Sequence, residues 1–164
     1  MGDGSKSVKA AVVQAAPVLF DKASTVEKAC GLIREAGRKG SNVVLLPEAF
    51  IPAYPRGLSF GMVVGSRSGP GRSLWKRYWE NAVEVPGTEV ESLGKAAKEA
   101  GVYLAVGVIE RDGEYSRGTL YCTLLYFGPD GKLMGKHRKL KPTGAERLIW
   151  GEGDGSTMPV FSTD

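Results

Sequence analysis

The sequence contains little cysteine and histidine, with two cysteines and one histidine in 164 residues. Cys30 and Cys122 are far apart in the chain, without a CxxC spacing and without a neighbouring histidine. This pattern supports neither a zinc site nor a disulfide framework, because both need clustered or regularly spaced cysteines. We expect both cysteines to be small, inert residues of an apolar core.

Long apolar runs are also absent, since none approaches the roughly 18 residues needed to span a bilayer. The polar start, residues 1–7, lacks the apolar centre of a signal peptide. Lys6 stands where the N-myristoylation pattern after Gly2 requires serine or threonine. We therefore expect a polar tail over residues 1–7, no membrane partner and a cytoplasmic location.

Positive charge is not concentrated over the chain as a whole. The 22 basic residues exceed the 18 acidic ones by only four, and a basic cluster occurs only over residues 136–141, where five of six residues are basic if His137 is counted. A dedicated nucleic-acid binder usually has a larger basic stripe with interleaved aromatic residues. We expect no nucleic-acid partner, and binding through residues 136–141 remains a third alternative.

The amino-terminal part of the chain alternates between strand and helix patterns. An apolar run predicts a strand over 8–16, and another predicts a strand over 42–46. Between them, Ser24 and Glu27 have the spacing of a capping box that starts a helix extending toward Gly40. This order predicts a βαβ unit with two parallel strands.

Proline and glycine interrupt the chain after this unit. Residues 47–71 contain four prolines and five glycines, which predicts a long loop beside a strand end, a common place for function. No repeat, linker or low-complexity tract divides the chain, so one domain over residues 8–164 is the simplest interpretation. The remaining patterns predict helices over 73–83 and 89–100 and strands over 102–109, 120–127, 132–136 and from Val160 onward.

Two charged residues stand at informative places in this pattern. Glu48 follows Pro47 directly after a buried strand, and Lys139 follows a later strand. A carboxylate and a lysine at one sheet edge can act as a base and an electrostatic clamp around a reacting carbon. On these residues alone, a glutamate that merely starts a loop and a solvated basic loop remain open as alternatives.

Several blocks occur in order along the chain. They are Leu45-Leu-Pro-Glu48-Ala-Phe, Tyr54-Pro-Arg-Gly57, His137-Arg-Lys139-Leu-Lys-Pro-Thr143, and Glu146-Arg-Leu-Ile-Trp-Gly151 followed by Gly153-Asp-Gly-Ser156. Together they resemble the nitrilase family over effectively the whole chain. Within the carbon–nitrogen hydrolase superfamily, they are more similar to the nitrilase branch than to the amidase, carbamoylase or ureidopropionase branches. Plant-type enzymes that act on β-cyanoalanine look especially similar.

The resemblance implies roles for four residues. Members of the family use a Glu-Lys-Cys triad, in which Glu48 would be the base and Lys139 would stabilise charge that develops on the nitrile nitrogen. Glu146 would be a second glutamate that fixes the lysine or the incoming water, with an exposed loop acid paired to Arg147 as the alternative. Tyr54 would face the substrate, or would pack under the proline-rich loop. The resemblance implies neither a metal nor an organic cofactor.

The resemblance also implies an α/β fold, the four-layer αββα sandwich, of which this chain would supply about the first half. The cysteine nucleophile of the family would fall shortly after Asp164, so this chain by itself is expected to be inactive. The first hypothesis is a nitrilase, a hydrolase that converts small organic nitriles to carboxylic acid and ammonia, or to amide, and that forms homo-oligomers. The alternatives are a short form that regulates a full-length nitrilase and, within the family, a β-cyanoalanine hydratase/nitrilase or an amidase.

Overall fold

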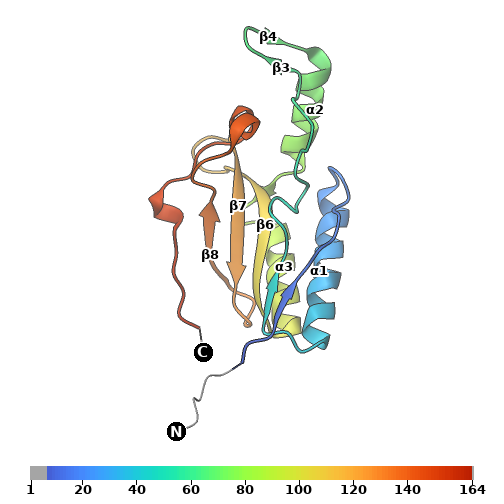
Figure 1. The fold of residues 1–164 in the computed structure, drawn as a ribbon, viewed down its shortest axis with the longest axis vertical. Helices are drawn as coiled ribbons and strands as arrows, with labels where there is room; N and C mark the ends of the chain where they lie inside the picture. The colour runs from blue at the N-terminus through green and yellow to red at the C-terminus, as the bar shows by residue number, and fades with distance from the viewer. Residues whose placement is uncertain (1–6, 164) are drawn as a thin grey trace.

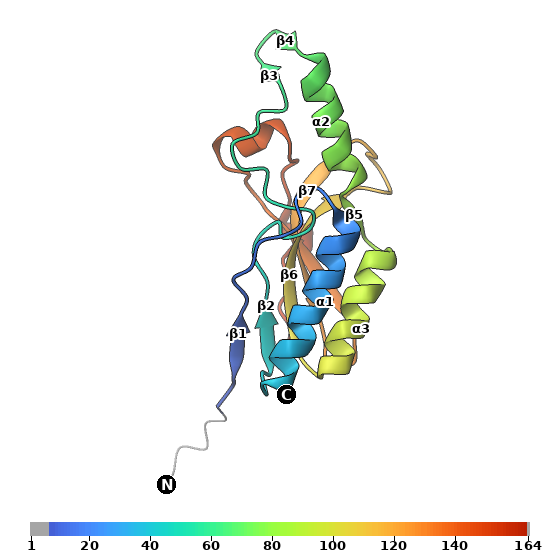
Figure 2. The same cartoon turned by 90° about the vertical axis from the view of Figure 1, so that its right-hand side faces the viewer.

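The computed structural model of the protein describes residues 7–163 and is built around one mixed sheet. Of the expected polar tail, residues 1–6 lie outside the described residues. Two long helices cover one face of the sheet (Figures 1 and 2). The six strands of the sheet are β1 (Ala10–Val12), β2 (Val43–Leu45), β5 (Val83–Glu84), β6 (Tyr103–Arg111), β7 (Leu120–Phe127) and β8 (Leu133–Arg138).

The sheet is parallel in its first half and antiparallel in its second. Its order is β1-β2-β6-β7-β8, and β5 also pairs with β6. The pairs β1/β2, β2/β6 and β5/β6 are parallel, whereas β6/β7 and β7/β8 are antiparallel. The predicted βαβ unit is confirmed, because β1 and β2 pair in parallel on either side of helix α1 (Lys22–Arg38) in the sequence.

The predicted N-cap of α1 is wrong by three residues. Asp21 is the N-cap, and its carboxylate accepts hydrogen bonds from the backbone N–H of Ser24 at 2.9 Å and from the Ser24 hydroxyl at 2.8 Å. An aspartate accepts the free N–H groups of a first helical turn as well as serine does, so the earlier residue caps the helix. Ser24 therefore supports the cap and does not form a capping box with Glu27.

The proline- and glycine-rich segment contains more regular structure than expected. It includes a short hairpin, β3 (Met62–Val63) with β4 (Ser66–Arg67), and helix α2 (Gly69–Glu80) begins four residues before the predicted position. Ser68 caps this helix, accepting from the Gly71 N–H at 3.1 Å, and Pro70 fits the first turn, where no N–H partner is needed. Figure 1 shows the hairpin and α2 projecting together beyond the end of the sheet.

The other predicted elements are largely confirmed. Helix α3 (Thr88–Ala100) ends at Gly101, whose φ of +65° is the left-handed conformation that glycine adopts without strain. The strands β6, β7 and β8 lie where the patterns placed them. No strand begins at Val160 in the described part of the chain, and Phe161 instead packs against Tyr126 with ring centroids 5.3 Å apart.

The apolar core lies between the sheet and the helices α1 and α3. Ile33 of α1 and Leu93 of α3 are completely buried against sheet residues such as Val44 and Val106. Within residues 7–163, no helix is both long and apolar enough to cross a membrane.

The opposite face of the sheet is more open. Because Val12, Leu45, Ala105 and Tyr126 are register partners on neighbouring strands, their side chains lie on one face. Val12 is 77% exposed and Leu45 is 40% exposed, whereas the register neighbours Val44 and Leu104 point into the helix-covered core. The described residues therefore supply helices on one side of a sheet and an accessible apolar surface on the other.

A buried ion cluster ties the antiparallel strands together on the helix-covered face. Glu110 is only 1% exposed, and its carboxylate accepts hydrogen bonds from Arg138 at 2.6 Å, Lys136 at 2.5 Å and Thr123 at 2.8 Å. Burial alone would raise the pKa of Glu110, but the hydrogen bonds from Arg138 and Lys136 outweigh it, and the pKa lies below its ordinary value. The charged form of Glu110 therefore stabilises the fold.

We expect Glu110→Gln to lower the free energy of unfolding at pH 7 by about 1–3 kcal/mol, because charge-assisted hydrogen bonds are lost. A carboxyl whose pKa is lowered in the folded state stabilises the fold above pH 4.5, its ordinary pKa. This contribution disappears as the pH falls through the folded pKa. Urea unfolding between pH 7 and pH 3 should therefore show parent and variant converging in acid. The exposed control Glu27→Gln should stay close to the parent at pH 7, and an equal loss in both variants would contradict the role of the cluster.

Candidate functional site

Glu48 lies on a short arch of backbone that follows β2. Leu46 N–H donates to Ala105 O at 2.9 Å, and the chain returns to β6 where Ile109 N–H donates to Ile51 O at 2.7 Å. Residues 47–50 therefore leave the strand and cross close over β6 between two anchored points. The Glu48 side chain is 52% exposed, so its carboxylate stays accessible at the carboxyl end of β2.

The arch is possible because β6 carries a glycine beneath it. A Cβ atom on Gly107 would lie 2.3 Å from Pro47 O and 2.7 Å from the Glu48 Cα, both closer than such contacts ever are. Ala49, completely buried, has a φ of +50°, a conformation that costs a residue with a side chain on the order of 1–3 kcal/mol. The surrounding structure therefore fixes where Glu48 sits.

Lys139 follows β8 and reaches back over the sheet to Glu48. Its backbone N–H donates to Cys122 O at 2.8 Å, and its own carbonyl accepts from Gly153 N–H at 2.9 Å. Its Nζ donates at 2.8 Å to Glu48 Oε1 and at 2.8 Å to Glu146 Oε2. One ammonium group thus bridges two carboxylates that lie far apart in the sequence.

Glu146 is held by the short 3-10 helix η1 (Gly144–Leu148). Thr143 and Glu146 form a capping box, in which the Glu146 carboxylate accepts from the Thr143 N–H at 2.6 Å. The Glu146 side chain is only 11% exposed and pairs with Lys139, whereas Arg147 donates to Pro142 O at 3.0 Å. The expected alternative, an exposed acid paired with Arg147, does not match this geometry.

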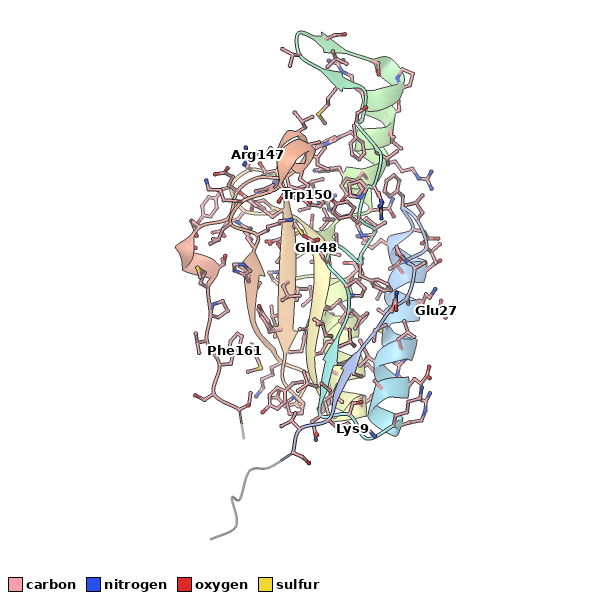
Figure 3. All side chains as sticks on the ribbon, in the orientation of Figure 1. Lys9, Glu27, Glu48, Arg147, Trp150 and Phe161 are labelled. Carbon is pink, nitrogen blue, oxygen red and sulfur yellow. The ribbon has the colours of Figure 1, made fainter. Side chains whose placement is uncertain are left out.

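Two aromatic residues, Tyr54 and Trp150, contact the charged group of the site. The Tyr54 hydroxyl donates to Glu146 Oε1 at 2.7 Å, and the Tyr54 ring meets the Trp150 ring edge-on with centroids 5.5 Å apart. Lys139 Nζ lies 5.7 Å from the centre of the Trp150 ring, within the range of a cation–π contact. Figure 3 shows Glu48 below Trp150 at the end of the sheet from which α2 projects.

The charges at the site are stabilised by one another. Burial alone would lower the pKa of Lys139, but the hydrogen bonds that its ammonium donates to Glu146 and Glu48 raise it above its ordinary value. Burial alone would raise the pKa of Glu146, but hydrogen bonds from Lys139, the Thr143 N–H and Tyr54 lower it. Lys139 is therefore a cation and Glu146 an anion at neutral pH.

A cavity of about 630 Å³ opens beside this group on the accessible face of the sheet. Glu48 and Lys139 lie among its lining residues together with Cys122, Leu124 and His137. The cavity is mostly apolar, which suits a small organic molecule with one polar reacting group. Within residues 7–163, no three histidine, cysteine, aspartate or glutamate side chains are arranged to hold a metal ion.

The four residues singled out in the sequence meet in space. Glu48, Lys139, Glu146 and Tyr54 form one continuous hydrogen-bonded chain. Two members of the neighbourhood were not anticipated: Trp150, and Cys122, which is buried as expected but contacts Glu48. The Thr143-x-x-Glu146 spacing is a sequence signal that would have placed Glu146 on a helix start.

The chain resembles known proteins over nearly its whole length. The family model described as carbon-nitrogen hydrolase matches residues 9–164. The chain is 58% identical over 155 residues to an aliphatic nitrilase of Sinorhizobium fredii (strain HH103), covering 94% of this chain and 49% of that protein. It is 52% identical over 159 residues to nitrilase 2 of Arabidopsis thaliana, covering 97% and 46%. The chain thus spans about half the length of the curated relatives it matches.

Solved structures give the same result for the fold. An amidase from Nesterenkonia sp. superposes with a TM-score of 0.65 at 16% identity, covering 90% of this chain and 48% of that one. A carbon-nitrogen hydrolase from Helicobacter pylori G27 superposes with a TM-score of 0.61 at 21% identity, covering 90% and 46%. The expected α/β fold of the nitrilase superfamily is confirmed. The chain belongs to the carbon-nitrogen hydrolase family, in which its similarity is to nitrilases.

Proposed function

We propose that this chain supplies the general base and the charge-stabilising lysine of a nitrilase, a hydrolase that converts organic nitriles to carboxylic acid and ammonia. The observation that carries the proposal is the Lys139 ammonium, which lies 2.8 Å from both the Glu48 and the Glu146 carboxylates at the edge of the cavity. The identity to nitrilases over nearly the whole chain supports the choice of substrate class.

In this proposal Glu48 is the general base. Its Oε1 atom is engaged by Lys139, and its side chain is half-exposed, so the second carboxylate oxygen is free to accept a proton from a cysteine nucleophile. The thiolate attacks the nitrile carbon and forms a thioimidate, with the nitrile nitrogen taking up the negative charge and then a proton. Water next attacks the same carbon, and ammonia leaves to give an acyl-enzyme. A second water then hydrolyses the thioester, which releases the carboxylic acid and restores the cysteine thiol.

Lys139 stabilises the charge that develops on nitrogen. Its ammonium is fixed by two carboxylates and needs no rearrangement as the charge develops, which is the condition for effective electrostatic catalysis. Glu146 holds Lys139 in place, and Tyr54 holds Glu146 through the 2.7 Å hydrogen bond to Oε1. Collapse of the tetrahedral intermediate in the other direction gives amide, so a nitrile hydratase activity is the family-level alternative, alongside amidase.

The cysteine nucleophile of this proposal is not among residues 1–164. Cys30 is buried between α1 and α3, and burial raises its thiol pKa. Cys122 is also buried, and burial together with the Glu48 charge raises its pKa to about 12. Both thiols stay protonated near neutral pH, which argues against either as a nucleophile. We propose that the nucleophile belongs to a polypeptide that continues beyond Asp164.

An association role is the second candidate function. The accessible sheet face, with Val12 77% exposed and Leu45 40% exposed, favours contact with another apolar surface. A short form could use this face to bind a full-length nitrilase and regulate it, and a complete enzyme could form homo-oligomers. Neither a nucleic acid nor a membrane is part of this proposal.

We expect Glu48→Gln, in the full polypeptide that carries these residues, to reduce ammonia release from a nitrile by about 10²–10⁴-fold, because the general base is lost. Circular dichroism should show an unchanged fold. Glu27→Gln, which alters an exposed glutamate on α1, is the matched control and should retain full activity. Activity of Glu48→Gln within threefold of the parent would refute the base assignment.

We expect Tyr54→Phe to lower kcat by about tenfold, because Glu146 loses a hydrogen bond to its charged carboxylate and holds Lys139 less firmly. The measurement is steady-state ammonia release with the same nitrile. Tyr115→Phe, at a tyrosine that is 85% exposed, should leave kcat unchanged. Equal rates for Tyr54→Phe and the parent would mean that Tyr54 only packs under the loop.

We expect residues 1–164 alone to release no ammonia from nitriles, because no ionised thiol faces Glu48. Size-exclusion chromatography of this chain mixed with a full-length nitrilase separates the two candidate functions. Co-elution accompanied by a change in the activity of the partner would support the regulatory role. Separate elution would argue against the regulatory role and leave the nitrilase function as the remaining candidate. Turnover by residues 1–164 themselves would contradict the absence of a nucleophile.

A further inference from the structure

Cys122 connects to both charged residues of the site, although nothing in the proposed reaction uses it. Its Sγ donates to Glu48 Oε1 at 3.5 Å, within the range for a sulfur donor. Its carbonyl oxygen accepts the Lys139 backbone N–H at 2.8 Å. One residue of β7 thus contacts the side chain of the carboxylate and the backbone of the lysine.

The thiol and the ammonium contact the same oxygen of Glu48. Lys139 Nζ lies 2.8 Å from Oε1, and the Cys122 thiol is directed at the same atom. With two donors on Oε1, the carboxylate is fixed in rotation about its last bond. Oε2 is then the oxygen left to take a proton, and Glu48 is among the residues that line the cavity.

The chemistry of a buried thiol suits this role. Cys122 is 5% exposed and sits beside a carboxylate, so it stays protonated and acts as a donor. The neighbouring β6 residue in register, Ile109, is completely buried, and the thiol therefore points from a packed position into the edge of the cavity.

We propose that Cys122 is a positioning residue, whose protonated thiol orients the Glu48 carboxylate so that a single oxygen serves as the base. The contact between the Cys122 thiol and Glu48 can be tested on this chain itself. Only its effect on kcat rests on the proposed nitrilase function. The contact and its kinetic effect are therefore tested separately.

The first experiment measures contact between the thiol and the carboxylate without any turnover. Iodoacetamide alkylation of each cysteine, followed by mass spectrometry from pH 7 to pH 11, gives the ionisation profile of both thiols in the folded chain. Glu48→Gln removes a negative charge next to Cys122, so its alkylation at a fixed alkaline pH should accelerate about three- to tenfold. Cys30, which lies between α1 and α3 and whose Sγ donates to Ser92 O, is the internal control and should be unchanged. An unchanged Cys122 profile would overturn the proposed contact.

The second experiment measures the kinetic consequence in the full polypeptide that carries these residues. Cys122→Ala should lower kcat about three- to tenfold with little change in KM, because one weak hydrogen bond to the base is lost. Cys122→Ser, which restores a donor, should recover kcat to within about twofold of the parent. Cys30→Ala is the matched control for loss of a buried thiol and should leave kcat unchanged.

Two kinetic outcomes would overturn the positioning role. If Cys122→Ser is as slow as Cys122→Ala, the thiol acts through its volume and not through its hydrogen bond. If Cys122→Ser abolishes turnover altogether, Cys122 is a nucleophile and not a positioning residue. A complete lack of nitrilase activity in the parent would refute the proposed function, whereas the alkylation result would still decide whether Cys122 contacts Glu48.

Discussion

The ammonium group of Lys139 is the point at which the site is joined. Glu48 comes from the loop after β2, Lys139 from the end of β8, and Glu146 from η1, so three separate parts of the chain meet at one cation. Two carboxylates beside each other would repel, and the cation between them removes that cost. The same interaction raises the pKa of Lys139, so its side chain stays charged at neutral pH.

The sheet provides the frame that brings these groups together. Parallel pairing of β1, β2 and β6 places the carboxyl ends of these strands at one edge of the sheet, where the loop after β2 carries Glu48. Antiparallel pairing of β7 and β8 then returns the chain to that edge, where Lys139 follows β8. Gly107 completes the frame, because its missing side chain lets the Glu48 backbone pass close over β6.

The two faces of the sheet have different roles. One face packs against α1 and α3 through completely buried residues such as Ile33 and Leu93, and this packing supplies most of the apolar burial. The other face carries the cavity, the site and the accessible Val12–Leu45 surface. A site built on the open face can be completed by further structure without disturbing the core beneath it.

The sequence alone was sufficient for the class of fold and the candidate residues. Apolar periodicity located β2, α3, β6, β7 and β8, because burial of one face imposes that period directly on the chain. Ordered blocks identified Glu48, Lys139, Glu146 and Tyr54. Local signals were ambiguous where two residues could serve the same purpose, as at the start of α1, where Asp21 caps the helix in place of Ser24.

Only the tertiary structure decided how these residues are connected. That Glu146 pairs with Lys139, and not with its neighbour Arg147, depends on where η1 packs, which no spacing in the sequence encodes. That Cys122 meets Glu48 follows from the register of β7 against β6 together with the arch over Gly107. Contacts between residues distant in the chain are set by packing and strand register, and these are properties of the folded molecule as a whole.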